Sequence, residues 1–264
     1  MKNFQKLILI CLFFYLPLSG NAWGVTGHRI VGQIADSYLN RETKREIEKI
    51  LGFESVAMAS NWPDFIKSDP AYKYLDTWHY LNIKGGVTQN EFNLFLAADT
   101  ATDAYTKINF LVNQLKQNRN VLSQETKQLY LRLLIHIVGD VHQPMHVGRP
   151  DDRGGNSIKL KWFSDDSNLH QVWDSRLIDF QQLSYTEYTA AINHITREQR
   201  IALQQQPISQ WFWDSYILAE KLYADVKPDQ RLDYQYNFKF IGALNQRLLE
   251  GGVHLAGLLN DIFD

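Results

Sequence analysis

Residues 123–140, SQETKQLYLRLLIHIVGD, decide the fold class of this chain. The apolar residues of this stretch recur at helical spacing: Leu129, Leu133, Leu134 and Ile137. Ser123 precedes them as a possible N-cap, with Thr126 three residues later, and the run ends near Gly139. The pattern predicts one long amphipathic helix.

The same periodicity recurs over most of the chain. Six more segments show apolar residues at helical spacing: 28–39, 42–51, 101–117, 186–204, 209–226 and 237–262. In the last of them, Gly251-Gly252 suggests a bend. Only residues 157–163, SIKLKWF, alternate as a strand does. We therefore predict a mainly α single domain with little β structure, in which residues 60–97 and 141–172 form long functional loops.

The N-terminus is typical of a secretory signal peptide. Lys2 and Lys6 precede an apolar run that is too short to span a bilayer, and small residues up to Ala22 follow it. We expect cleavage after Ala22, so that the domain covers residues 23–264 and begins at Trp23. The protein would be secreted or periplasmic, without a membrane association after cleavage, and we expect a monomer without an obligate protein partner.

Charge and cysteine content exclude several kinds of binding. The formal net charge is −2, and loss of the two signal lysines makes the chain more acidic still, so nucleic acid would not be bound through a broadly basic surface. The single cysteine, Cys11, lies in the signal segment. A thiolate metal site is therefore excluded, and any metal must be held by histidine, carboxylate or backbone groups.

Two His/Asp pairs repeat a spacing that suits a metal. His136 and Asp140 lie four residues apart in the predicted helix, as do His170 and Asp174 in HQVWD, so each pair can face one ion. His146 follows the first pair after a turn at Pro144. Two such pairs with a third histidine between them predict metal binding.

Further candidate ligands lie outside this region. Asp64 and His79 each neighbour a tryptophan in the first long loop, and His28 follows the expected new terminus at Trp23. Zinc takes about four nitrogen or oxygen ligands per ion. The set suffices for two ions, and His28 with the freed terminus adds a third group.

In their order along the chain, these motifs resemble the zinc-dependent single-strand nucleases of fungi and plants, the mung bean nuclease type, which also act as 3′-nucleotidases. The motifs that carry the resemblance are WGVTGH, WPD, WHY, HIVGDVHQPMH, GGN and HQVWD. They run from Trp23 to Asp174, and the helical remainder fits the same fold, which is shared with zinc phospholipase C.

The resemblance implies three Zn²⁺ ions and a ligand set for each. One ion would take Asp64, His79, His136 and Asp140, and a second His146, His170 and Asp174. The third would take the amino nitrogen and carbonyl oxygen of Trp23, with His28 and with Asp140 as the bridge to the first ion.

Substrate contacts are implied in the same way. Lys67 and Asn156 would hold the scissile phosphate, so that they count with Asp64 and Asp140 as catalytic. Tyr80 would stack on a base. Asn82 departs from the family, which usually has aspartate there, and because an amide both donates and accepts, base preference is open.

The resemblance implies hydrolysis of single-stranded RNA or DNA and of 3′-nucleotides to 5′-phosphate products by a hydroxide that bridges two zinc ions. Two alternatives remain. A zinc phospholipase C has a similar cluster, but its first histidine lies further from the terminus, and glutamate usually replaces Asp174. A non-catalytic zinc-binding protein would not need Lys67, Tyr80 and Asn156. We expect His142, His194 and His254 to be structural or surface residues.

Overall fold

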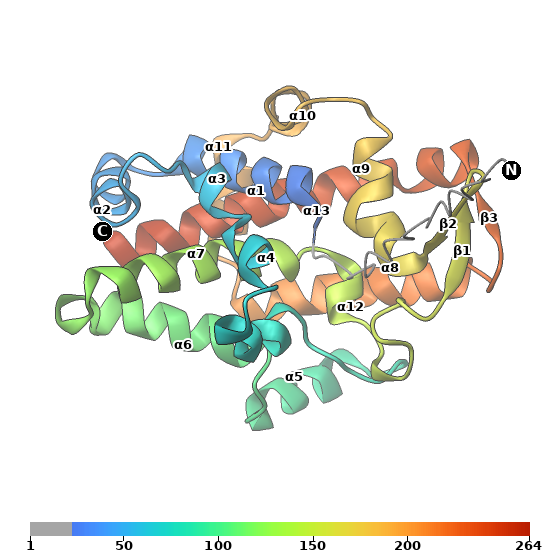
Figure 1. The fold of residues 1–264 in the computed structure, drawn as a ribbon, viewed down its shortest axis with the longest axis horizontal. Helices are drawn as coiled ribbons and strands as arrows, with labels where there is room; N and C mark the ends of the chain where they lie inside the picture. The colour runs from blue at the N-terminus through green and yellow to red at the C-terminus, as the bar shows by residue number, and fades with distance from the viewer. Residues whose placement is uncertain (1–22) are drawn as a thin grey trace, which may run out of the picture.

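The computed structural model describes residues 23–264, and the signal peptide expected over residues 1–22 lies outside them. The prediction of a mainly α domain is confirmed (Figure 1). The longer helices are α1 (Val25–Tyr38), α2 (Arg41–Leu51), α5 (Gln89–Ala98), α6 (Ala104–Gln117), α7 (Gln124–Asp140), α10 (Tyr185–Ile192), α11 (Arg197–Gln204), α12 (Ile208–Asp225) and α13 (Tyr234–Phe263). Among the described residues, no helix is both long and apolar enough to cross a membrane.

Short elements fill the two segments that the sequence marks as long loops. The first contains α4 (Trp62–Ile66), η1 (Pro70–His79) and α5, and α3 (Val56–Ala59) precedes it. The second contains η3 (Pro144–Val147), η4 (Pro150–Asp152), β1 (Lys159–Trp162), β2 (Asp165–Asn168) and α8 (Leu169–Gln171), and it is followed by the π-helical turn η5 (Val172–Arg176) and α9 (Leu177–Asp179). A further turn, η2 (Arg119–Val121), joins α6 to α7.

The prediction of one helix over residues 186–204 is wrong. The structure has α10 and α11 there, separated by residues 193–196. Thr196 caps α11 through a capping box, in which its side chain accepts from the Gln199 backbone and Gln199 reaches back to the Thr196 backbone. This start signal outweighs the apolar spacing that runs across the break.

The prediction that residues 60–97 lack regular structure is also wrong in part. Thr88 and Glu91 form a reciprocal capping box that starts α5, although this helix buries little beyond Phe92 and Leu96. The weakly amphipathic pattern hides the helix, and the cap residues were the signal for it.

The small sheet has the order β2-β1-β3, with β3 (Arg231–Leu232) on the other side of β1. The hairpin β1–β2 is antiparallel and pairs Lys159 with Asn168, whereas β3 runs parallel to β1. The predicted strand over residues 157–163 is therefore confirmed. The hairpin leads directly into α8, so it sets where the HQVWD motif starts.

The core lies where α1 and α7 pack against the long helix α13, which runs the length of the molecule (Figure 1). Buried aliphatic residues from each helix meet there, such as Ile34, Leu134 and Leu255. This packing holds the N-terminal part of α1 and the C-terminal part of α7 in a fixed relation. The metal-binding candidates occur at those two positions.

The pair Gly251-Gly252 allows this close packing, and α13 continues through it. A Cβ atom on Gly252 would lie 2.4 Å from the Cβ atom of Ile34 in α1, and one on Gly251 would lie 3.2 Å from the ring of His142. The absence of side chains at these two positions therefore serves the contact between α1 and α13.

Gly252→Ala is expected to lower the free energy of unfolding by about 1–3 kcal/mol, because the new methyl group overpacks the contact between α1 and α13. Gly242→Ala in the same helix is the matched control, since a Cβ atom there meets nothing within 4 Å. That change should stabilise the protein by about 0.5–1 kcal/mol. Denaturant unfolding of both variants measures the difference, and equal effects would contradict this account of the glycine pair.

Candidate metal centre

The end of α7 supplies the central pair of the site. His136 and Asp140 are fully buried, and His136 Nε2 lies 3.2 Å from Asp140 Oδ2. The other ring nitrogen, His136 Nδ1, lies 2.6 Å from the Ser60 carbonyl oxygen. The predicted i, i+4 spacing therefore brings both side chains to one point, and the Ser60 carbonyl orients the imidazole.

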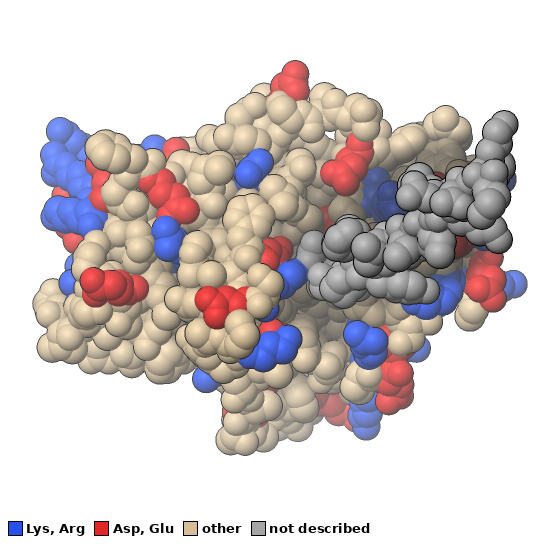
Figure 2. Space-filling model, viewed as in Figure 1, with Lys and Arg blue, Asp and Glu red and all other residues tan. Residues whose placement is uncertain are grey.

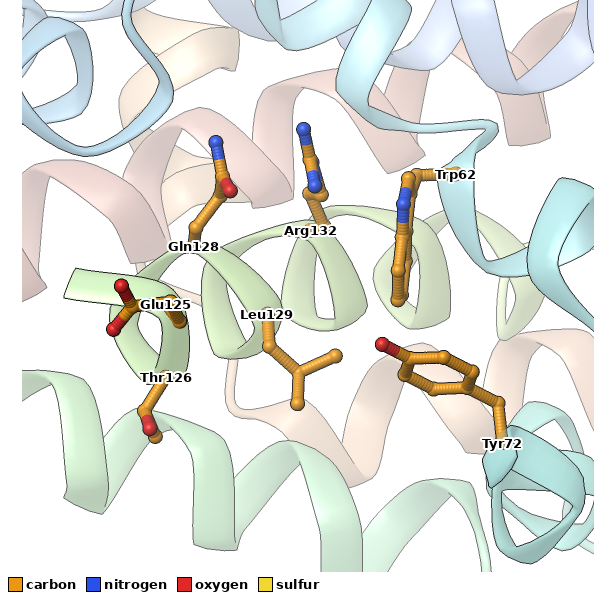
Figure 3. A pocket seen from close by; sticks show the side chains of 7 residues that line it. All are labelled: Trp62, Tyr72, Glu125, Thr126, Gln128, Leu129 and Arg132. Carbon is orange, nitrogen blue, oxygen red and sulfur yellow. The ribbon is translucent and has the colours of Figure 1, made fainter. Parts of the chain in front are cut away.

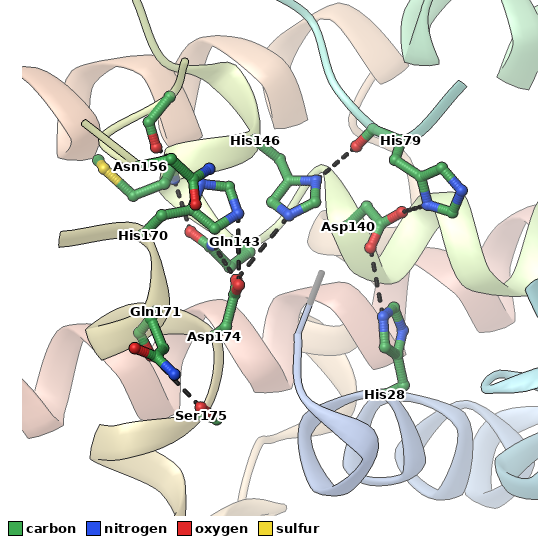
Figure 4. A network of polar contacts seen from close by, with 12 residues as sticks. His28, His79, Asp140, Gln143, His146, Asn156, His170, Gln171, Asp174 and Ser175 are labelled. Atoms are coloured by element: carbon green, nitrogen blue, oxygen red, sulfur yellow. Dashed lines mark hydrogen bonds and ion pairs between the residues drawn. The ribbon is translucent and has the colours of Figure 1, made fainter. Parts of the chain in front are cut away.

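Two more histidines converge on the same carboxylate. His28 of α1 places Nε2 3.2 Å from Asp140 Oδ1, and His79 at the end of η1 places Nδ1 2.9 Å from Asp140 Oδ2 (Figure 4). Asp64 of α4 joins His28 and His136 in a group whose ligand atoms lie within 4.8 Å of one another. Asp140 thus offers one oxygen to His28 and the other to His79 and His136, which is the arrangement expected of a bridging carboxylate.

The second predicted pair forms a separate group with His146. His170 Nε2 lies 3.3 Å from Asp174 Oδ2, and His146 Nε2 lies 3.9 Å from Asp174 Oδ1. All three residues are buried, and they come from α8, η5 and η3. Figure 4 shows this group beside the one around Asp140. The π-helical turn η5 carries Asp174, and such turns are frequent at functional sites.

Backbone carbonyls hold the histidines of the second group in one orientation. His146 Nδ1 lies 2.5 Å from the His79 carbonyl oxygen, and His170 Nδ1 lies 2.6 Å from the Gly154 carbonyl oxygen. If each Nδ1 carries the proton and donates it, each Nε2 has a free lone pair directed into the group. Metal-ligating histidines almost always have such an outer partner.

The electrostatics of the cluster also favour a cation. Burial is the largest cause that lowers the pKa of His28 to about 4 and of His170 to about 3, so both rings are neutral near pH 7. Burial acts in the same direction on His136, but the charges of Asp140 and Asp64 outweigh it and raise its pKa to about 9. The carboxylates of Asp140 and Asp64 therefore stabilise a positive charge at this place, and a metal ion would supply it in place of a proton.

Several buried atoms of the cluster have no hydrogen-bond partner among the described residues. They include both ring nitrogens of His28, Nε2 of His146 and Oδ1 of Asp140, and the contact between His28 and Asp140 at 3.2 Å lacks hydrogen-bond geometry. Unpaired buried polar atoms are costly. Within residues 23–264 three His/Asp groups could hold a metal, and two of them share His136: His28 with Asp64 and His136, and His79 with His136 and Asp140. The nitrogen and oxygen donors of all three suit zinc. The donor set therefore fits the predicted ions.

Trp23 lies at the edge of both groups. Its side chain is fully buried, and the backbone N–H of Gly24 donates to the Asp174 carbonyl oxygen at 2.6 Å. A Cβ atom on Gly139, next to Asp140, would lie 3.8 Å from the Trp23 ring. The structure thus places residues 23 and 24 near Gly139 and Asp174, and the role of Trp23 as a ligand stays a prediction.

Two of the four predicted substrate contacts, Lys67 and Asn156, lie beside the metal groups. Lys67 Nζ lies 3.3 Å from Asp64 Oδ1, and Asn156 lies beside His170 (Figure 4). The extended segment that carries Tyr80 and Asn82 runs along η3, since Leu81 N–H donates to the His146 carbonyl oxygen at 2.8 Å.

In that segment, Leu81 and Ile83 point into the core and Asn82 is exposed. Because side chains alternate along extended backbone, Tyr80 and Asn82 face the same side, toward solvent.

The remaining histidines are structural or exposed, as expected. His142 and His254 are buried, and the nitrogens His142 Nε2 and His254 Nδ1 lie 2.7 Å apart. His254 also stacks on Trp211, with ring centroids 4.8 Å apart. His194 is exposed between α10 and α11. None of the three occurs in a potential metal group of the described residues.

Sequence reasoning missed Gln143. This buried residue donates its side-chain amide to Asp174 and accepts a hydrogen bond from the backbone N–H of Met145 at 2.6 Å. It therefore connects the carboxylate of the second group to the turn that carries His146. Its place between His142 and Pro144 in the HQPMH motif was the signal that could have revealed it.

Comparisons with known proteins agree with this geometry. A family model described as S1/P1 Nuclease matches residues 23–264. Endonuclease 3 of Arabidopsis thaliana is 28% identical over 284 residues, which cover 97% of this chain and 94% of the relative. Nuclease P1 of Penicillium citrinum is 28% identical over 160 residues, which cover 58% of this chain and 57% of that protein. Nuclease S1 of Aspergillus oryzae is 28% identical over 159 residues, with 59% and 54% covered.

Proposed function

Because the chain belongs to the S1/P1 nuclease family and is a phosphodiester hydrolase, we propose that it is a secreted trinuclear-zinc enzyme that cleaves single-stranded RNA or DNA and 3′-nucleotides. The observation that supports this most is the coincidence of three buried His/Asp groups with Lys67 and Asn156 beside them. A zinc-binding protein without catalysis would have no need of a cation and an amide at that point.

Local charge must attract the substrate in this protein. The formal net charge is −2, and Figure 2 shows acidic and basic side chains interspersed over one face of the molecule. A positive electrostatic field confined to the metal centre would attract phosphate there despite the negative net charge of the protein. Zinc ions bound by these groups would lower the pKa of a water to about 7 and polarise the phosphoryl oxygens.

The chain's own residues would position the phosphate between the two groups. The Lys67 ammonium neutralises phosphate charge from the side of Asp64, and the Asn156 amide donates to a phosphoryl oxygen from the side of His170. The departing 3′ oxygen then faces the group of His146, His170 and Asp174, so the products carry 5′-phosphates.

Preference for single strands follows from access to Tyr80. A ring that stacks on a base needs this base unstacked from its neighbours, and a duplex interior does not offer one. Asn82 on the same side would hydrogen-bond the base edge, and its amide can serve either donors or acceptors. A mixed base preference is the expected consequence.

Digestion of single-stranded RNA and DNA by the chain that begins at Trp23 tests the proposal. With zinc we expect both polymers to give oligonucleotides with 5′-phosphate ends, and we expect little cleavage of a matched duplex. Chelation of zinc should abolish the cleavage of RNA and of DNA. Products with 3′-phosphate ends would refute the proposed polarity. A fully zinc-loaded chain that leaves both polymers intact would refute the nuclease itself.

Gln143→Leu is expected to weaken metal binding by the second group about 10- to 100-fold, because Asp174 loses the partner that orients it. Competition with a chelator measures the affinity. Gln210→Leu is the matched control, since Gln210 donates an equivalent bond to Asp214 at 2.7 Å within α12, and Asp214 belongs to no potential metal group of the described residues. Equal zinc affinity in both variants would contradict the role assigned to Gln143.

A further inference from the structure

A pocket of about 230 Å³ lies on the outer side of α7, between this helix, α4 and η1 (Figure 3). Trp62 and Tyr72 form one wall with their rings nearly perpendicular and their centroids 5.3 Å apart. Leu129 and Arg132 of α7 line the other side. Drug-sized ligands occupy pockets of about 300–1,000 Å³, so this one suits a single flat ring system.

Two helices, α4 and α7, each carry a residue that lines the pocket and a residue of the metal groups. In α4, Trp62 lines the pocket and Asp64, two residues on, joins the metal group of His28 and His136. In α7, Arg132 lines the pocket and precedes His136 by four residues, or about one helical turn of 5.4 Å. The metal centre and the pocket therefore lie within the reach of one short strand of nucleic acid.

The charges around the pocket favour an uncharged guest. The guanidinium of Arg132 lies over the Trp62 ring, 5.4 Å from its centroid, and pairs with Glu54 at 2.7 Å, which offsets its charge. Glu125 lines the pocket as well and would repel a phosphate. We therefore do not expect a phosphate group to bind in the pocket. Two aromatic rings and a guanidinium plane are, however, groups on which nucleobases stack.

Polar groups are also present for the edge of a base. Tyr72 and Gln128 both line the pocket, and the side chain of Gln128 offers an amide that can donate and accept. Phe65, three residues after Trp62 in the same short helix, has an exposed ring, although it does not line the pocket.

We propose that this pocket binds a nucleobase of the substrate strand, as a second base site a few nucleotides from the scissile phosphate. The inference rests on the proposed nuclease function and adds to it that strands longer than a dinucleotide gain affinity at Trp62 and Tyr72. The affinity for the substrate would thus depend on its length through a site outside the metal centre.

Steady-state cleavage of a dinucleotide and of a decanucleotide tests this with Tyr72→Leu, which keeps the apolar packing, and with Leu129→Trp, which fills the pocket. Each variant should raise KM for the decanucleotide roughly 5- to 10-fold, as expected for one lost stacking contact. KM for the dinucleotide and kcat for both substrates should change less than about twofold. Phe238→Leu, at a ring of α13 that is 86% exposed, is the control.

An unchanged KM for the decanucleotide overturns the pocket and leaves the nuclease proposal intact. A rise that is equal for both substrates also overturns it, because the loss then lies at the metal centre. Equilibrium binding of the decanucleotide to the Asp140→Asn variant measures the contribution of the pocket to affinity without catalysis. There, Tyr72→Leu should weaken binding by the same factor, and equal binding rejects the proposal whether or not the parent chain cleaves.

Discussion

Asp140→Asn is expected to lower the hydrolysis of single-stranded nucleic acid by at least about 100-fold and to reduce the zinc content below three ions per chain. The two carboxylate oxygens face different histidines, since His28 Nε2 lies 3.2 Å from Oδ1, which has no hydrogen-bond partner among the described residues, and His79 Nδ1 lies 2.9 Å from Oδ2. The amide keeps the size of the side chain but removes its charge and turns one of these acceptors into a donor. The loss therefore reaches two metal groups at once.

Zinc analysis and initial rates on a single-stranded polymer measure the two effects together. Asp261→Asn is the matched control, because Asp261 is an exposed residue that pairs with Lys116 at 2.6 Å, far along α13. That variant should keep full zinc content and rate. If Asp140→Asn retained three ions and the parent rate, Asp140 would not be the bridge between two groups.

A single zinc lost with an unchanged rate would assign Asp140 to a structural ion. The same outcome would move the reaction toward the group of His146, His170 and Asp174. The experiment therefore separates the two groups as well as testing the carboxylate.

Part of the His/Asp cluster was predictable from sequence because two of its His/Asp pairs are local. His136 and Asp140 share a face of one helix whatever the rest of the chain does, and the pair His170 and Asp174 keeps its spacing through α8 and the π-helical turn η5. Which pairs meet in space is a property of tertiary packing. The approach of His28 to Asp140 depends on α1 lying against α7 and α13. The spacing of residues does not predict this contact, and only the resemblance to a known family implied it.

Other features depend on contacts that no local pattern encodes. Gln143 matters because its amide reaches Asp174, a residue 31 positions away. The pocket between α4, η1 and α7 brings Trp62 and Tyr72 together with Arg132, which follows Tyr72 by 60 residues. By contrast, the start of α5 at Thr88 and Glu91 was visible in the sequence as a capping box. The helix was missed because its apolar periodicity is weak.

The predicted third ion, with the amino nitrogen of Trp23 as a ligand, would depend on where the chain begins. A peptide nitrogen has no lone pair to give to zinc, whereas a free amine, with a pKa of about 7.7–8.0, can be deprotonated by the ion. The indole of Trp23 is fully buried, and Gly24 N–H donates to the Asp174 carbonyl oxygen at 2.6 Å. Side chain and backbone therefore fix residue 23 beside the metal groups, so removal of residues 1–22 would convert an inert amide into a ligand at that place.

A chain that retains even Ala22 before Trp23 is expected to bind about two zinc ions and to cleave at least roughly 100-fold more slowly than the chain that begins at Trp23. Zinc content and initial rates on single-stranded RNA measure this. An alanine added after Asp264, at the exposed C-terminal end, is the matched control and should change neither quantity. His28 and Asp140 stay in place in every form, so a loss confined to the N-terminal extension assigns the effect to the amine. Equal zinc content and equal rates in the extended chain would show that Trp23 is a structural residue, and the enzyme would then be active before cleavage.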